Sequence, residues 1–132
     1  MCEIKVSIVC LTYNHAPYID KALESILSQE VDFPIEVVIH DDCSTDGSQK
    51  IIAKWQSKYP DIIFPVFNDE NQLQLGVDVF LKTANLARGK YIAYCETDDY
   101  WLDKNKLKKQ VIKMDSDPSI SLYAHEAIRV NS

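Results

Sequence analysis

The chain has 132 residues, 46% of them hydrophobic, with 14 Lys and Arg against 20 Asp and Glu and a formal net charge of −6. This length fits one domain, residues 1–132, that can bury a core, and the acidic balance without a basic stripe argues against a nucleic-acid partner. No apolar run is long enough to cross a membrane and no signal peptide is visible, so we expect a cytoplasmic domain.

Apolar residues recur with strand and helix periods in alternation along the chain. The expected elements, in order, are a strand over 6–11, a helix over 18–29, a strand over 35–40, a helix that opens at the turn 44–47, a strand over 62–67, a loop over 68–76, a helix over 77–87, a strand over 90–95, a helix over 103–114 and a strand over 120–123. Ser44 or Thr45 is expected to cap the second helix, and Gly89 to end the third. The alternation favours an α/β fold with a mainly parallel sheet and helices on both faces.

The cysteines and histidines show no metal-binding spacing. Cys10 and Cys95 lie inside predicted strands, where a cysteine usually packs as a small hydrophobic residue. Together with Cys2 and Cys43 they form no CxxC pair, which favours a reduced compartment and no zinc site. The histidines are far apart in sequence and each is expected to be structural or exposed; they are His15, His40 and His125.

Three of the predicted strands run directly into polar residues. These residues are Thr12-Tyr13-Asn14 after the strand 6–11, Asp41-Asp42 after 35–40, and Glu96-Thr97-Asp98-Asp99 after 90–95. Because helices link the strands, the strands should be parallel and their carboxyl ends should share one edge. Open α/β sheets bind ligands outside these ends, where the strand order reverses. The sequence therefore predicts a ligand site built from the three polar ends.

The third polar end carries three carboxylates within four residues, Glu96, Asp98 and Asp99. At about 5 Å and an effective dielectric constant near 20, each like-charged pair costs roughly 3 kcal/mol. A divalent cation would remove this repulsion, and Mg²⁺ sites often combine one or two carboxylates with substrate phosphates. The alternative is a solvated acidic loop that caps the following helix. We favour the metal site.

Two residues at the other ends suit a nucleotide base. Tyr13 follows the first strand, where an aromatic face can stack on a base, although packing of the loop is the alternative for this residue alone. Asp42 follows the second strand and can accept a hydrogen bond from a base N–H group. Paired acids are also common in turns, which is the alternative for Asp41 and Asp42.

The three motifs, in this order and spacing, resemble those of the family 2 glycosyltransferases with the GT-A fold. The matching stretches are 6–14, 41–48, 87–92 and 96–101, and the resemblance runs from about residue 5 to residue 123. It implies a Rossmann-like GT-A sheet that binds a nucleotide-sugar donor, with a UDP-sugar as the expected donor. It also implies a Mn²⁺ or Mg²⁺ ion that acts as a Lewis acid on the leaving diphosphate.

The resemblance implies a role for individual residues as well. Leu11, through its backbone, and Tyr13 would line the base, and Asp42 would bind the pyrimidine with Asp41 as its support. The nucleotide-binding set that it implies is Leu11, Thr12, Tyr13, Asn14, Asp41, Asp42 and Asp98. The metal-binding set is Asp98, Asp99 and Glu96, which correspond to the DXD motif, and Trp101 would border the sugar or acceptor pocket.

The chain departs from the family pattern at two places. Glu96 stands where the family usually has Asp, which moves the expected metal contact toward Asp98 and Asp99. Val79, Phe80 and Leu81 stand where family members often carry an Arg and an Asn, and Lys82 is the only cation nearby, so this helix is not expected to contact the diphosphate.

The resemblance covers the donor-binding half of these enzymes. The acceptor-binding half, with its catalytic Asp or Glu base, is expected beyond Ser132. The implied reaction is an inverting transfer to a hydroxyl group of a glycan or lipid-linked acceptor. Peripheral membrane association would come from the part that this chain lacks.

Three other interpretations are open. A sugar nucleotidyltransferase would share the sheet and the metal, but it would need a Gly-rich, basic loop at residues 12–17, which contain neither Gly nor Lys nor Arg. A signalling receiver domain would need its acid pair after the first strand and a phospho-accepting Asp after the third. A non-catalytic nucleotide-binding module, in which the acids serve folding, is the third.

Overall fold

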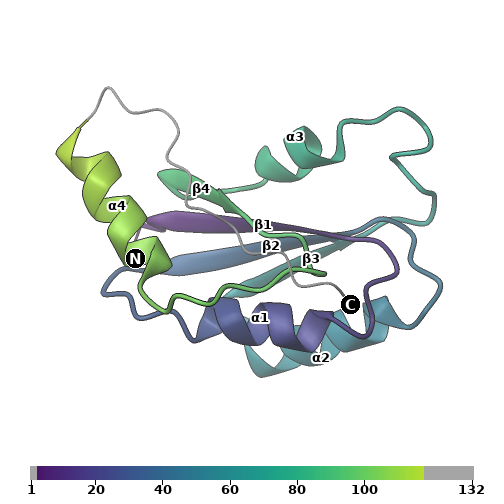
Figure 1. Ribbon diagram of the computed structural model, residues 1–132. Helices are drawn as coiled ribbons and strands as arrows, with labels where there is room; N and C mark the ends of the chain where they lie inside the picture. The colour runs from purple at the N-terminus through teal and green to yellow at the C-terminus, as the bar shows by residue number, and fades with distance from the viewer. Residues whose placement is uncertain (1–2, 118–132) are drawn as a thin grey trace.

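The computed structural model of the chain describes residues 3–117, so the strand expected over 120–123 lies outside the described residues. It contains a four-stranded sheet in the order β3-β2-β1-β4, in which every pair of neighbours is parallel (Figure 1). The strands are β1 Val6–Thr12, β2 Ile35–Asp41, β3 Ile63–Phe67 and β4 Tyr91–Tyr94. The predicted α/β fold with a mainly parallel sheet is therefore confirmed.

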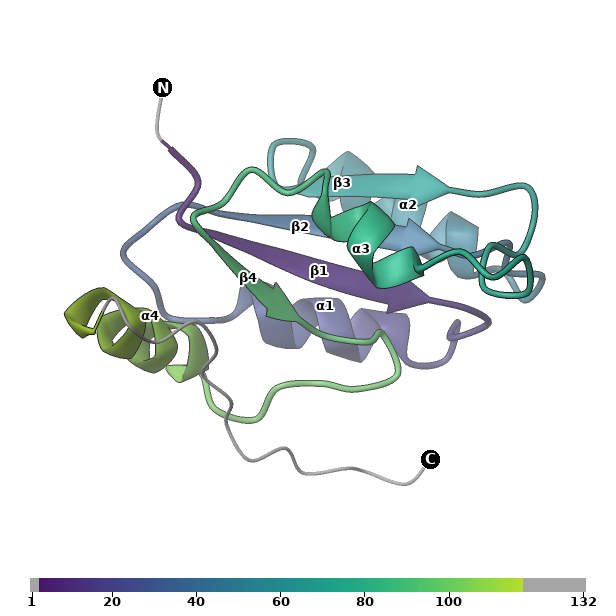
Figure 2. The same cartoon turned by 90° about the horizontal axis from the view of Figure 1, so that it is seen from above.

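Helices lie on both faces of the sheet, as predicted. The described helices are α1 Ile19–Leu27, α2 Ser48–Lys58, α3 Val79–Ala84 and α4 Lys106–Ser116. Figures 1 and 2 show α1 and α2 on one face, α3 on the other, and α4 near the end where the strands begin. There Lys5 Nζ lies 2.9 Å from a carboxylate oxygen of Asp115 in α4. None of the helices within residues 3–117 combines the length and the apolar character that a bilayer crossing requires.

The main hydrophobic core lies between the sheet and helices α1 and α2. Alternate residues of each strand face it, because successive side chains of a strand point to opposite faces. Its buried members include Val6, Ile8, Cys10, Ile19, Leu23, Ile26, Val37, Ile39, Ile52 and Ile63. Full burial of an aliphatic side chain contributes about 1.5–3 kcal/mol to the stability of the folded chain. This layer therefore stabilises the sheet whose strands end in the polar residues.

Cys10 and Cys95 belong to this core, which confirms their predicted role as small hydrophobic residues. Both are free thiols, and burial is the main reason why their pKa values are raised. The pKa of Cys95 rises to about 12, with the nearby charge of Asp99 adding to the effect of burial. Both thiols therefore stay protonated and uncharged at neutral pH.

The start of α2 corrects one prediction, because neither Ser44 nor Thr45 caps the helix. The helix begins at Ser48, and Asp46 Oδ1 accepts hydrogen bonds from the Ser48 backbone N–H at 3.0 Å and from its hydroxyl at 2.5 Å. Gly47 precedes the helix with a φ of +94°, a left-handed conformation that favours glycine. The Ser44 hydroxyl instead donates to Asp41 at 2.5 Å, which ties it to the end of β2.

Helix α3 is shorter than the predicted 77–87, and Gly89 does not end it. Asp78 caps its start by accepting a hydrogen bond from Leu81 N at 3.0 Å, and its last residue is Ala84. Gly89 lies against β1, where a Cβ atom would come within 2.6 Å of Ser7 N. The glycine is required by the close approach of two backbone segments that are distant in sequence, and local spacing could not reveal this contact.

A buried carboxylate group lies at the end of the sheet where the strands begin. Ser7 and Glu36 are paired residues of β1 and β2. Glu36 Oε2 accepts hydrogen bonds from the Ser7 hydroxyl at 2.5 Å and from Arg88 N at 2.7 Å, and Oε1 accepts one from Arg88 Nε at 2.9 Å. Gly89 N donates to Ser7 Oγ at 2.8 Å. Burial by itself would raise the pKa of Glu36, but these hydrogen bonds outweigh it and lower the pKa. We refer to Ser7, Glu36, Arg88 and Gly89 as the Glu36 cluster.

Candidate functional site

The three polar strand ends meet at one edge of the sheet, as the parallel topology predicts. Thr12 and Asp41 are the last paired residues of β1 and β2. The acidic loop, residues 96–99, follows β4 and is joined to β1 by a hydrogen bond from Thr97 N to Leu11 O at 3.3 Å. The strand order reverses between β1 and β4, the position where open α/β sheets bind ligands.

The loop after β1 is tied to the loop after β2. Asn14 Oδ1 accepts a hydrogen bond from Thr45 N at 2.8 Å, and Asn14 N donates to Ser44 Oγ at 2.9 Å. Asn14 has a left-handed φ of +54°, which asparagine tolerates better than most residues. Its neighbour Tyr13 is 45% exposed, so part of its aromatic ring is accessible to a stacking partner.

Asp41 and Asp42 have different surroundings. Asp41 is fully buried and accepts hydrogen bonds from Ser44 N at 3.0 Å and Gln49 Nε2 at 2.8 Å, so it holds the turn together. Asp42 is 5% exposed and accepts backbone hydrogen bonds from Gln72 N at 2.6 Å and Leu73 N at 3.1 Å. No motif in the sequence indicates this contact, which anchors the polar loop 68–76 beside the site.

His40 is buried beside these acids, as a structural histidine should be. Its Nε2 atom is hydrogen-bonded to the side-chain amide of Asn68, and Nδ1 is buried without a hydrogen-bond partner in the described part of the chain. Burial lowers the pKa of His40, an effect that the charge of Asp42 opposes. His40 is therefore neutral at neutral pH and adds no positive charge to the site.

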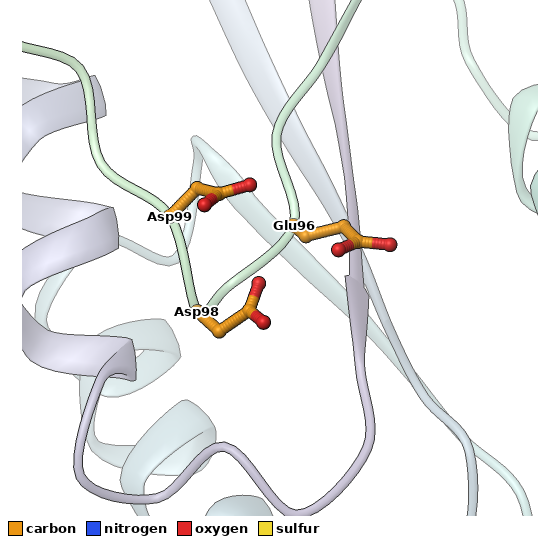
Figure 3. A group of neighbouring side chains, drawn as sticks. All are labelled: Glu96, Asp98 and Asp99. Carbon is orange, nitrogen blue, oxygen red and sulfur yellow. The ribbon is translucent and has the colours of Figure 1, made fainter. Parts of the chain in front are cut away.

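The acidic loop brings Glu96, Asp98 and Asp99 together. One carboxylate oxygen from each lies within 4.8 Å of the others, and Figure 3 shows the three side chains leaving one turn of the chain. Asp98 and Asp99 are exposed, whereas Glu96 is partly buried and accepts a hydrogen bond from the Tyr94 hydroxyl at 2.8 Å. Burial and the Glu96 carboxylate raise the pKa of Tyr94, so the phenol remains a donor. Hard oxygen donors at this spacing suit a divalent cation such as Mn²⁺ or Mg²⁺.

The structure also places His15 next to the acidic loop, a contact that the sequence analysis missed. His15 Nδ1 lies 2.8 Å from Thr97 Oγ1, and Nε2 lies 3.7 Å from Asp98 Oδ2. Thr97 Oγ1 is also 2.8 Å from Thr12 Oγ1. His15 and Thr97 are 82 positions apart in sequence, so no local motif could predict their contact.

Two other residues singled out from the sequence, Trp101 and Lys82, make contacts with residues outside the acidic loop. Trp101 packs against the core, and its ring faces Lys106 Nζ at 4.6 Å. Lys82 Nζ donates to the side chain of Gln72 at 3.2 Å, in the loop that Asp42 anchors. The binding roles expected for the site residues, including Trp101, stay predictions.

Comparison with known proteins identifies a matching family, similar sequences and similar structures. The sequence model of Glycosyl transferase family 2 matches residues 7–132. An uncharacterized protein of Mycobacterium tuberculosis is 40% identical over 121 residues, which are 91% of this chain and 34% of that protein. The chain therefore spans about a third of the length of this relative.

Two solved structures are also similar. The mannosyltransferase PcManGT of Pyrobaculum calidifontis, in complex with GDP-Man and Mn²⁺, matches with a TM-score of 0.75 and 30% identity over 88% of this chain and 33% of that chain. TarS of S. aureus, residues 1–349 in complex with UDP, matches with a TM-score of 0.71 and 30% identity over 86% of this chain and 32% of that one. Both similarities extend over most of the described fold.

Proposed function

The chain belongs to Glycosyl transferase family 2 and has the fold of the GT-A glycosyltransferases, and we propose that the edge of the sheet where its strands end binds a nucleotide-diphosphate sugar with a divalent cation. The observation that carries the proposal is the convergence of the Glu96, Asp98 and Asp99 carboxylates within 4.8 Å at the point where the strand order reverses. Carboxylates that share a site with a diphosphate need a cation between them, because both groups are anionic.

The base would lie over the loop after β1. Tyr13 is exposed there and offers its ring for stacking, while Asp42 stands at the end of the neighbouring strand. Because the Asp42 carboxylate already accepts two backbone hydrogen bonds, a base N–H would add to them through a remaining lone pair. We propose a UDP-sugar as the donor; TarS was solved with UDP and PcManGT with GDP-Man, so the two nucleotides are the ones to compare.

Asp98 and Asp99 are the residues that would hold the cation. They are exposed, whereas Glu96 is partly buried and engaged by the Tyr94 hydroxyl, so Glu96 would support them from one side. The cation, when bound, would supply Lewis-acid stabilisation of the negative charge on the leaving diphosphate.

The whole protein would transfer the sugar with inversion. An acceptor hydroxyl would form the new bond to the anomeric carbon as the bond to the diphosphate oxygen breaks, and its proton would pass to a base outside this chain's donor site. The role of this chain is to bind and orient the donor. The acceptor would be a glycan or a lipid-linked sugar.

Calorimetric titration of the chain with UDP, GDP and ADP, each with and without Mn²⁺, tests the proposal. We expect Mn²⁺-dependent binding of UDP and little binding of ADP. Asp99→Asn keeps the shape of the side chain and should remove most of the Mn²⁺-dependent gain in affinity. Tyr13→Ala should weaken binding about tenfold with or without metal, since stacking of a base on an aromatic ring contributes about 1–3 kcal/mol. Tyr13→Phe keeps the ring and is the matched control.

The outcomes separate the parts of the proposal. Preferred binding of GDP would keep the donor site and change the base. If the folded chain bound none of the three nucleotides, or if Asp99→Asn and Tyr13→Ala bound UDP as the unmodified chain does, the site assignment would be wrong. Circular dichroism of each variant establishes that it is folded.

A further inference from the structure

We propose that His15 is a positioning residue that orients Asp98 and joins the loop after β1 to the acidic loop. The inference rests on the proposed donor site and deepens it, because it adds a residue that holds two parts of that site in register. It is carried by four contacts of described residues: two made by the imidazole ring of His15, one between buried hydroxyl groups, and one that fixes the backbone of His15.

The Nδ1 side of the imidazole is anchored in the protein interior. Thr97 is fully buried and Thr12 is 2% exposed, and their hydroxyl oxygens lie 2.8 Å apart. Thr97 Oγ1 is also 2.8 Å from His15 Nδ1. A hydroxyl group has one proton to donate, and Thr97 Oγ1 has two possible acceptors, His15 Nδ1 at 2.8 Å and Leu11 O at 3.4 Å. Because the contact to Nδ1 is the shorter one, we assign Thr97 as the donor to Nδ1 and Thr12 as the donor to Thr97. This direction leaves Nε2 with the proton.

The Nε2 side faces the acidic loop. Nε2 lies 3.7 Å from Asp98 Oδ2, just beyond hydrogen-bonding distance, and the His15 side chain is 21% exposed. An N–H group this close to a carboxylate favours orientations of Asp98 that keep one oxygen on the histidine side. The second oxygen of Asp98 is then free to face the proposed cation.

The backbone of His15 is held independently of its ring. Its N–H group donates to Ser48 Oγ at 3.2 Å, at the start of α2. The loop that carries both Tyr13 and His15 is therefore attached to the start of α2 through the His15 backbone. A change in the ring should loosen Asp98 while leaving this attachment in place.

Three substitutions of His15 separate the effect of its contact with Thr97 from the effect of its contact with Asp98. Asparagine places a polar atom near the position of Nδ1 but has nothing at Nε2, so His15→Asn keeps the Thr97 contact and loses the one to Asp98. Glutamine reaches the position of Nε2, so His15→Gln keeps the contact to Asp98. His15→Ala removes both. The measurements are UDP affinity by calorimetry with and without Mn²⁺, Mn²⁺ affinity by the paramagnetic resonance signal of the free ion, and the midpoint of thermal unfolding.

We expect His15→Ala and His15→Asn to reduce the Mn²⁺-dependent gain in UDP affinity about threefold to tenfold, the effect of losing one polar contact. His15→Gln should retain it to within about twofold, and UDP affinity without metal should be unchanged in all three. Equal Mn²⁺-dependent gains in the unmodified chain and all three variants would overturn the proposal. An equal loss in all three, accompanied by lower unfolding midpoints and weaker metal-free binding, would also overturn it, because the role would be in folding alone. Absence of Mn²⁺-dependent UDP binding in the unmodified chain would instead reject the donor site itself, and this inference with it.

Discussion

Glu36 and the acidic loop, which lie at opposite ends of the sheet, use carboxylate groups in opposite ways. Where the strands begin, Glu36 is 1% exposed, and its two oxygens accept hydrogen bonds from the Ser7 hydroxyl and from the backbone and side chain of Arg88. Where the strands end, carboxylate oxygens of Glu96, Asp98 and Asp99 lie within 4.8 Å of one another. Glu96 accepts a hydrogen bond from the Tyr94 hydroxyl, and Asp98 lies near the His15 imidazole.

The difference separates the structural role of Glu36 from the cation-binding role proposed for the acidic loop. A buried carboxylate loses its hydration, so it persists only where donors replace the water, and a single missing donor is costly. Exposed carboxylates remain hydrated and need no such donors, which leaves their oxygens available to a ligand. The Glu36 cluster is therefore part of the fold, whereas the acidic loop has the properties of a site.

Removal of the buried Glu36 carboxylate is expected to have the largest effect on the stability of the chain. Glu36→Ala would leave the buried Ser7 hydroxyl without its acceptor and would remove the acceptor of the Arg88 backbone and side-chain N–H groups. We expect the free energy of unfolding to fall by about 3 kcal/mol. Urea denaturation followed by circular dichroism measures it, with Glu24→Ala on the exposed surface of α1 as the control. A loss below about 1 kcal/mol would show that the cluster is not a structural element.

Gly89→Ala tests the same end of the sheet through the backbone. The added methyl group would lie 2.6 Å from Ser7 N and 2.7 Å from Ser7 Oγ, so β1 or the preceding segment must shift. Overpacking of this kind costs about 1–3 kcal/mol, and we expect about 2 kcal/mol. Gly76→Ala is the matched control, since a methyl there meets nothing within 4 Å and only its φ of +79° opposes it. Equal losses of unfolding free energy in the two variants would contradict the close contact.

Acid should weaken the Glu36 cluster. The pKa of Glu36 is lowered in the folded chain from its ordinary value of 4.5, because hydrogen bonds from Ser7 and Arg88 outweigh the opposing effect of burial. A carboxylate with a lowered folded pKa contributes stability that is fully present above its unfolded pKa and is lost as the pH falls through the folded pKa. Below about pH 4.5, the unfolding free energy of the unmodified chain should therefore fall more steeply than that of Glu36→Gln. Urea titrations across this range measure both, and parallel curves would contradict the assignment.

The architecture could be predicted from the sequence because its signals are local. Apolar periods of two residues and of nearly four residues identified the strands and helices, and their alternation required a parallel sheet. What could not be predicted were features set by distant contacts. The need for Gly89 depends on how closely the chain approaches β1. At the start of α2, Ser44 is hydrogen-bonded to Asp41, and Asp46 is the partner of Ser48.

The candidate site was predictable to a similar extent. The polar ends of three strands were visible in the sequence, and a parallel sheet had to bring them to one edge. The partners of those residues were not visible, because they come from other loops. Asp42 anchors Gln72 and Leu73, and His15 reaches Thr97 and Asp98, over separations of at least 30 residues that leave no periodic trace.

The smallest expected effect on stability is that of changing Asp99 in the acidic loop, at the other end of the sheet from Glu36. Like charges at about 5 Å and an effective dielectric near 20 repel by roughly 3 kcal/mol, but Asp98 and Asp99 are exposed, so water and salt screen most of this cost. Asp99→Asn should therefore leave the free energy of unfolding unchanged or raise it by up to about 0.5 kcal/mol, as for other exposed charge pairs. Urea denaturation measures the change, with Glu24→Gln as a control for the loss of one negative charge. A decrease above about 1 kcal/mol would mean that Asp99 holds the fold as Glu36 does, and the acidic loop would then lose its claim to be a binding site.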